Sequence, residues 1–157
     1  MSLLQLFKWF DATPISLIIR NSTYIFPVVE VFHLFGLTLL LGTMTVIDMR
    51  MLGLGMRRQS VSQLAGFLGP WTLLGVACMI VTGVPLFMSE AVKLSGSSPF
   101  FYKMIFLVCA VTLHFTLHRK AIASSAKPGS GLGKLAACLS LMFWLGVALA
   151  GRAIAFL

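Results

Sequence analysis

The sequence predicts an all-α integral membrane protein, one domain over residues 1–157, built as a four-helix bundle with short amino-terminal interfacial helices. Hydrophobic residues make up 59% of the chain and charged residues 10%, and the mean hydropathy is +0.98, far from a soluble domain. Four apolar stretches have the length of about 20 residues that a helix needs to span a bilayer. They cover about 24–47, 68–89, 100–120 and 134–156. A membrane barrel would need alternating strands, whereas "MIFLVCAVTL" is apolar at almost every step.

Residues 1–22 are expected to form two short helices at the membrane interface. Thr13 is a suitable N-cap for a second helix with Pro14 at its first position. The segment lacks the pattern of a cleaved secretory signal, so we expect it in the mature protein. The alternative is that it frays into the interface. One face of the first helix would collect the apolar residues Leu3, Leu4, Phe7 and Phe10.

The connections between spans are short and rich in helix breakers, which predicts antiparallel neighbours. They read "MRMLGLGMRRQSVSQ", "KLSGSSP" and "SSAKPGSGLGK". None is long enough for a separate soluble domain. Pro70 and Pro85, both in the second span, are the one hint of the broken helices that carriers use.

The net charge of +8 points to lipid headgroups and not to nucleic acid, because the basic residues are scattered at span ends. With four spans, the first and third connections share a side. That side carries Arg50, Arg57, Arg58, Arg119, Lys120, Lys127 and Lys134, and the other carries Lys8, Arg20, Lys93, Lys103 and Arg152. The positive-inside rule then predicts a multi-pass protein of the bacterial inner membrane with both termini outside the cytoplasm.

Signatures of soluble enzymes are absent from the sequence. Cys78, Cys109 and Cys138 stand singly in three different spans, where a thiol behaves as a small apolar group. The sequence has no Cys-x-x-Cys-His haem attachment site, no paired-cysteine metal pattern and no phosphate-binding glycine loop.

Ionisable residues inside the spans are the candidates for function, because such groups are costly in hydrocarbon. They are Glu30, His33, His114, His118 and Arg152. Counted from the outer span ends at about 1.5 Å per residue, Glu30 lies ~9 Å deep, His33 ~14 Å and His114 ~21 Å. Arg152 returns to about the depth of Glu30. We therefore expect these two to form an ion pair, with a proton-accepting Glu30 as the alternative.

His33 and His114 are expected to be the axial ligands of one haem b iron. Their depths differ by about one helical turn, on helices that can face across a bundle core. Bis-imidazole coordination leaves no open position on iron, so such a haem transfers electrons. Propionates would pair with Arg20, Arg152 or Lys103.

Glycines on three spans would let a haem macrocycle lie close to backbone, or would simply let the helices pack closely. They are Gly36, Gly42, Gly75, Gly83, Gly146 and Gly151.

His118 follows His114 by one turn and cannot occupy the opposite side of the same iron. Three interpretations stay open: His118 caps the helix end beside Arg119 and Lys120, contacts a propionate, or ligates a second cofactor. The first is preferred, because "LHRKAI" resembles an interfacial stop. A shift of the third span by one turn would exchange the ligand roles of the two histidines.

Two other classes of function compete with a cytochrome. A transition-metal site, as in a metal or small-ion carrier or channel, would use Glu30 and His33 with His114 and His118, but Glu30 and His118 are separated by roughly 18 Å of depth. A smaller site of His33, His114 and one other group remains open. In a cofactor-free structural subunit, His33 would bond to a backbone carbonyl or to Thr116.

In that subunit, Asp48 and Arg50 would form an ordinary pair at a helix end.

The first span, "HLFGLTLLLGTMTVIDMRMLG", and a third span with histidines near its end resemble an uncharacterised family of small bacterial four-helix membrane proteins. More distantly, the chain is similar to cytochrome b561-type and copper-resistance D-type membrane domains. The b561 type implies two haems held by two histidine pairs. The three histidines here allow one complete pair, His33 with His114 or His118.

The sequence thus predicts a small b-type haem protein that passes electrons between a membrane quinone and a partner redox protein, as an electron-transfer or quinone-linked oxidoreductase subunit. Its partners would be the bilayer, the quinone and the redox protein. Whether it forms homo-oligomers or joins a larger complex stays open.

Overall fold

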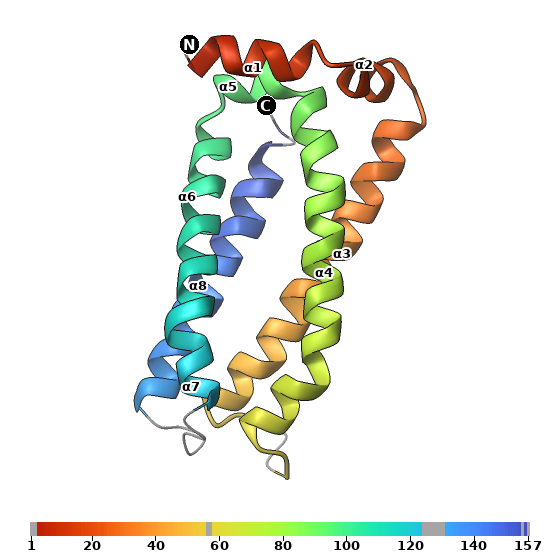
Figure 1. The fold of residues 1–157 in the computed structure, drawn as a ribbon. Coiled ribbons are helices and arrows are strands. Elements are labelled where there is room, and N and C mark those ends of the chain that lie inside the picture. Colours follow the sequence, from red (N-terminus) through yellow and green to blue (C-terminus); the bar gives the residue numbers. More distant parts are fainter. Residues whose placement is uncertain (1–2, 56–57, 124–130, 155, 157) are drawn as a thin grey trace.

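A computed structural model describes residues 3–55, 58–123, 131–154 and 156, and the described residues form an all-helical bundle (Figure 1). In chain order the elements are α1 (Leu3–Asp11), α2 (Pro14–Asn21), α3 (Ile25–Met51), α4 (Val61–Ser89), α5 (Ala91–Ser95), α6 (Ser98–Leu113), the π-helical turn η1 (His114–His118), α7 (Arg119–Ala123) and α8 (Gly131–Ile154).

Four helical units are long and apolar enough to cross a membrane: α3, α4, the continuous unit Ser98–Ile122 and α8. The predicted fold class is confirmed, and the chain is a multi-pass membrane protein embedded in lipid. Large apolar side chains cover its outside, as a lipid-facing surface requires. Both termini lie at the end of the bundle that α1 and α5 cover (Figure 1). We call this the terminal end and the opposite one the loop end.

The second span is longer than predicted, and it is not broken. Helix α4 begins at Val61 because Ser60 and Gln63 form a capping box, in which each side chain bonds to the other residue's backbone N–H at 3.1 Å. The helix continues through both Pro70 and Pro85. The half-helices that would favour a carrier are therefore absent from α4.

The amino-terminal segment forms the two predicted short helices, which cross the terminal end (Figure 1). Thr13 is the N-cap of α2, and its hydroxyl accepts a hydrogen bond from the backbone N–H of Ser16. Phe7 of α1 packs edge-on against Phe87 and Phe100, with ring centroids 5.5 and 6.2 Å away. These contacts fix α1 on the bundle.

The bundle consists of two tightly packed helix pairs, α3 with α4 and α6 with α8. Glycines make this approach close: a Cβ on Gly75 would lie 2.9 Å from the backbone nitrogen of Leu40, and one on Gly146 would lie 2.9 Å from the ring of Phe106. By contrast, a Cβ on Gly42 would meet nothing within 4 Å. Gly75 and Gly146 therefore allow close helix packing, whereas Gly42 has no such role.

Three apolar clusters follow one another along the bundle axis. At the terminal end the cluster is Phe7, Ala91 and Leu94. The middle cluster comprises Leu40, Met44, Ala110, Trp144 and Val147, and the cluster at the loop end comprises Ile47, Met51, Val61, Ala121, Ala136 and Ala137.

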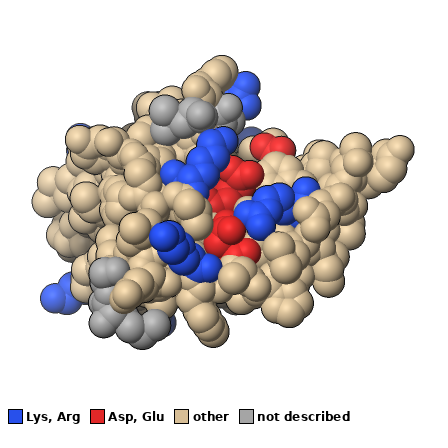
Figure 2. All heavy atoms as spheres, turned by 90° about the horizontal axis from the view of Figure 1, so that it is seen from above, with Lys and Arg blue, Asp and Glu red and all other residues tan. Residues whose placement is uncertain are grey.

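Acidic and basic side chains mix on the terminal end (Figure 2). Arg20 pairs with Asp11 at 2.8 Å and Lys93 with Glu90 at 3.4 Å. The terminal end has five basic and three of the four acidic residues, which gives it a net charge of +2. The loop end has seven basic residues by the sequence assignment and one acidic residue, Asp48, which gives it a net charge of +6. The two ends therefore differ strongly in charge.

Candidate functional site

Asp48 and His118 form a buried hydrogen-bonded pair near the loop end. The last turns of α3 supply Asp48, and η1 supplies His118, whose Nε2 lies 2.8 Å from Asp48 Oδ1. Both side chains are essentially inaccessible to solvent. The ring of His114 stacks on that of His118, with centroids 5.2 Å apart. The helix widens to a π turn here, since the backbone N–H of Arg119 bonds to the carbonyl oxygen of His114.

This pair corrects two predictions. Arg50 is not paired with Asp48, because its Nε donates instead to the carbonyl oxygen of Gln59 at 2.7 Å. His118 is not an exposed helix cap, because it is buried against Asp48. Asp48 and His118 are 70 positions apart in the sequence, and their contact depends on how α3 packs against η1. No local sequence pattern predicts such a contact.

Buried polar atoms around this pair lack hydrogen-bond partners. They are His118 Nδ1 and His114 Nδ1, whereas Asp48 Oδ2 and the hydroxyl oxygen of Ser140 lie within reach of each other. Ser140 lies on α8 next to the carboxylate of Asp48. Buried polar groups are nearly always paired with protein or ordered water, so this gathering is unusual within the described residues.

His33 stands at a second polar level, closer to the terminal end. Its Nδ1 lies 2.9 Å from Thr82 Oγ1 on α4, and the Thr82 hydroxyl donates to the carbonyl oxygen of Cys78 at 2.6 Å. Because the single hydroxyl proton is used there, His33 Nδ1–H donates to Thr82 Oγ1. The lone pair on Nε2 is then free, and that nitrogen has no hydrogen bond among the described residues. Thr116 is not the partner of His33, since it bonds to Thr112 of its own helix.

Lys103 approaches His33 from α6 across the bundle. Its ammonium is close enough to His33 for their charges to interact. The lysine side chain lies along α8, where a Cβ on Gly151 would be 3.7 Å from Lys103 Cε, while a Cβ on Gly83 would be 3.0 Å from His33 Cε1. Within the described part of the chain, Lys103 makes no hydrogen bond or ion pair. A half-buried cation at this level therefore has no counter-ion.

The Asp48–His118 contact sets the register between α3 and the third span. His33 and Lys103 each precede that contact by 15 residues, so they occupy nearly the same level. His114 lies 11 residues beyond Lys103, ~16 Å of helix rise. The predicted axial pair of His33 and His114 is therefore not brought together. The prediction assumed that both spans begin at equal depth, which this contact contradicts.

The predicted Glu30–Arg152 ion pair is not formed either. Glu30 is exposed on α3, and the Arg152 guanidinium lies over the ring of Phe156, with its carbon 5.1 Å from the centroid. The acidic residues that pair with basic side chains among the described residues are Asp11, Asp48 and Glu90. The sequence placed Glu30 and Arg152 at the same depth in the membrane. Equal depth does not determine the directions in which the two side chains point.

The comparisons with known proteins give a family but no function. The model of a family of unknown function, DUF6644, matches residues 6–157. The chain belongs to this family. A search of curated proteins and a search of solved structures each found no match. The distant similarity to cytochrome b561-type and copper-resistance D-type domains gains no support from them.

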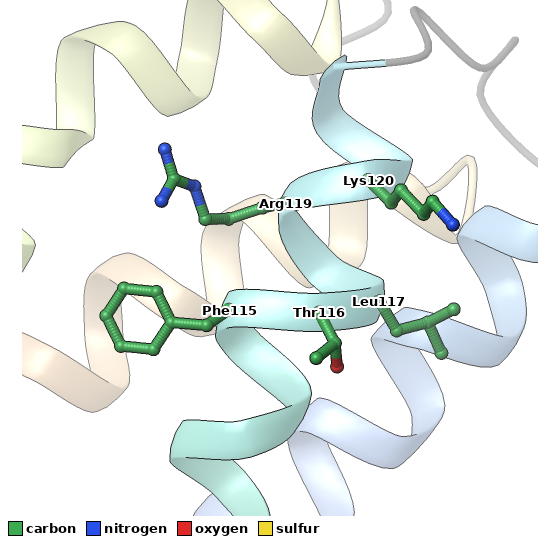
Figure 3. Close-up of a pocket in the computed structure, with 5 residues that line it drawn as sticks. All are labelled: Phe115, Thr116, Leu117, Arg119 and Lys120. Atoms are coloured by element: carbon green, nitrogen blue, oxygen red, sulfur yellow. The ribbon is translucent and has the colours of Figure 1, made fainter.

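This DUF6644 protein also has a shallow surface recess of about 630 Å³ on η1 and α7. It is lined by Phe115, Thr116, Leu117, Arg119 and Lys120, and Phe115 and Arg119 project to the same side of the helix (Figure 3). All five residues come from one continuous helical segment, so the recess is not a cofactor slot between helices. Among the described residues, no group of three or more His, Cys, Asp or Glu is arranged to hold a metal ion.

Proposed function

We propose that this chain is a small b-type haem protein and that His33 is the residue that binds the haem iron. One observation carries the proposal: Nδ1–H of His33 is fixed by Thr82, and Nε2 is left without a partner. Metal-ligating histidines almost always donate the other ring N–H to an oxygen acceptor, which sets the tautomer and the direction of the lone pair. Neither His114 nor His118 has this arrangement, since His114 Nδ1 is unpaired and His118 Nε2 is engaged by Asp48.

The charge beside His33 suits a haem carboxylate. Lys103 supplies a cation without a counter-ion at the same level, and an ammonium–carboxylate contact would satisfy it. Gly83 lets the His33 ring pack directly against α4, and Gly151 lets the Lys103 side chain lie along α8.

The bis-histidine coordination from which the sequence predicted electron transfer is not available here, because His118 is bonded to Asp48 and His114 lies at the level of His118. When bound, a haem would supply one-electron chemistry, and we propose a membrane quinone and a redox protein as the partners. The chain's own part is to orient the imidazole through Thr82 and to keep the site within an apolar bundle.

The charge difference between the two ends supports an orientation in the bacterial inner membrane. The loop end carries more basic residues and thus faces the cytoplasm under the positive-inside rule. Both termini and the His33 level then belong to the outer half of the membrane.

The absorption spectrum of the purified protein tests the proposal. Protein expressed with ample haem precursor should show a Soret band and, after dithionite, the alpha band of b-type haem. His33→Ala should lose the haem, whereas His114→Ala, the matched control, should retain it. Folded wild-type protein that is colourless would contradict the proposal, as would full haem content in His33→Ala. In either case the hydrogen bond between Thr82 and His33 only stabilises the fold, and a cofactor-free membrane subunit explains the protein better than a cytochrome does.

A further inference from the structure

We propose that Asp48, His118 and His114 form a proton-binding site at the loop end of the bundle. This site is separate from the His33 level, and the proposal does not depend on a bound haem. In the unloaded form Asp48 is ionised and His118 Nε2–H donates to its Oδ1. The added proton binds at Nδ1 of His118, giving an imidazolium that stays paired with Asp48.

The pair has the chemistry for this step. Nε2 of His118 and Oδ1 of Asp48 are 2.8 Å apart, so the carboxylate stabilises the added positive charge directly. Histidine is the side chain whose ordinary titration falls in the physiological range. Paired Asp and His groups buried inside membrane helices are typical of proton relays.

The unpaired atoms indicate where the proton and its solvent would be. Nδ1 of His118 has no partner, nor does Nδ1 of His114, and the Ser140 hydroxyl lies next to the Asp48 carboxylate. An ordered water bonded to such groups would satisfy several of them at once, as buried waters usually do. The proton-accepting nitrogen would then be in contact with water although it is inaccessible from outside.

His114 and the π turn connect this site to the loop end. The ring of His114 stacks on that of His118 at 5.2 Å, inside the π turn that ends at Arg119. Arg119 is close enough to act electrostatically on His114. The facing group from α8 is Ser140, and the described part of α4 contributes apolar residues of the loop-end cluster there. Arg119 and Lys120, which directly follow His118, are exposed, so the site lies near the surface of the loop end.

Apolar residues dominate the bundle core on the terminal side of the site. The middle cluster lies between the Asp48 level and the His33 level. Its buried members come from α3, α6 and α8, and Val76 and Met79 of α4 pack against them. We therefore propose that the site exchanges its proton with the loop end, which is the nearer surface.

Nitrogen NMR of the three histidines tests this proposal directly. Protein in lipid nanodiscs would carry ¹⁵N-labelled histidine, and His33→Gln and His114→Gln would assign the ring signals. Between about pH 9 and pH 5, His118 should change reversibly from one protonated ring nitrogen to two. Asp48→Asn should remove this doubly protonated form from that range. Asp11→Asn, the same substitution at an exposed ion pair, should leave the His118 signals unchanged.

The wild-type protein alone decides the case if Asp48→Asn does not fold. A His118 ring that keeps one protonation pattern from about pH 9 to pH 5 would overturn the proposal. So would an Asp48→Asn protein whose His118 titrates as in the wild type. A haem-free sample serves equally well, so failure here is distinguishable from failure of the haem proposal.

Discussion

Removing either member of the buried Asp48–His118 pair should destabilise the protein far more than removing an exposed pair. The perturbation is His118→Leu and Asp48→Leu, singly and together. Each single change strands a polar partner in a site where both side chains are inaccessible. The double change replaces both with apolar groups next to the loop-end cluster.

The expected magnitude follows from that burial. Breaking a buried ion pair from one side costs about 3–5 kcal/mol, whereas replacing both partners with apolar residues is often neutral or stabilising. The double variant should therefore be more stable than either single variant, with a coupling free energy of at least about 2 kcal/mol. The control is the Glu90–Lys93 pair, whose lysine side chain is 54% exposed. Its coupling should stay below about 1 kcal/mol.

The assay is reversible unfolding in mixed detergent micelles, followed by circular dichroism, on both sets of three variants. Losses that simply add for Asp48 and His118 would refute the reasoning. A coupling equal to that of the exposed control pair would refute it as well, because burial would then not be what makes the pair strong.

Three further predictions follow from other contacts. Gly75→Val should cost about 1–3 kcal/mol of unfolding free energy, because its Cβ would collide with the backbone of α3, while Gly42→Val should change little; equal effects in a thermal unfolding assay would contradict this. Thr82→Val should weaken haem retention about 10–100-fold, because His33 loses the acceptor that orients it, and haem transfer to apomyoglobin measures this; an unchanged transfer rate would count against the role of Thr82. A reporter fused after residue 157 should be active only outside the cytoplasm, and cytoplasmic activity would reverse the orientation.

The spans were predictable because composition and length determine them locally. The predicted stretch 24–47 corresponds to α3, Ile25–Met51, and 134–156 corresponds to α8, Gly131–Ile154. The N-cap at Thr13 was readable for the same reason. The start of α4 at Val61 was missed because the capping residues precede the apolar run by several positions.

The candidate site was only partly predictable, because it depends on the relative heights of helices. The sequence identified His33 as a candidate because an ionisable residue is energetically costly inside a membrane span. Its partner Thr82 could not be predicted, because their contact depends on the close packing of α3 against α4. Asp48 was set aside as a helix-end residue, since its neighbour Arg50 offered a local pair. The signal that was available was a second titratable residue, His118, near the same predicted end of the bundle.

The central claim is that the imidazole of His33 binds a haem iron, and chemical rescue tests it most directly. His33→Gly would be purified without haem and then supplied with haem in the presence and absence of free imidazole. We expect a b-type spectrum only with imidazole, because the small ligand can occupy the space of the deleted ring. His114→Gly should bind haem without any addition. A His33→Gly protein that binds haem equally well without imidazole, or a His114→Gly protein that requires it, would contradict the account.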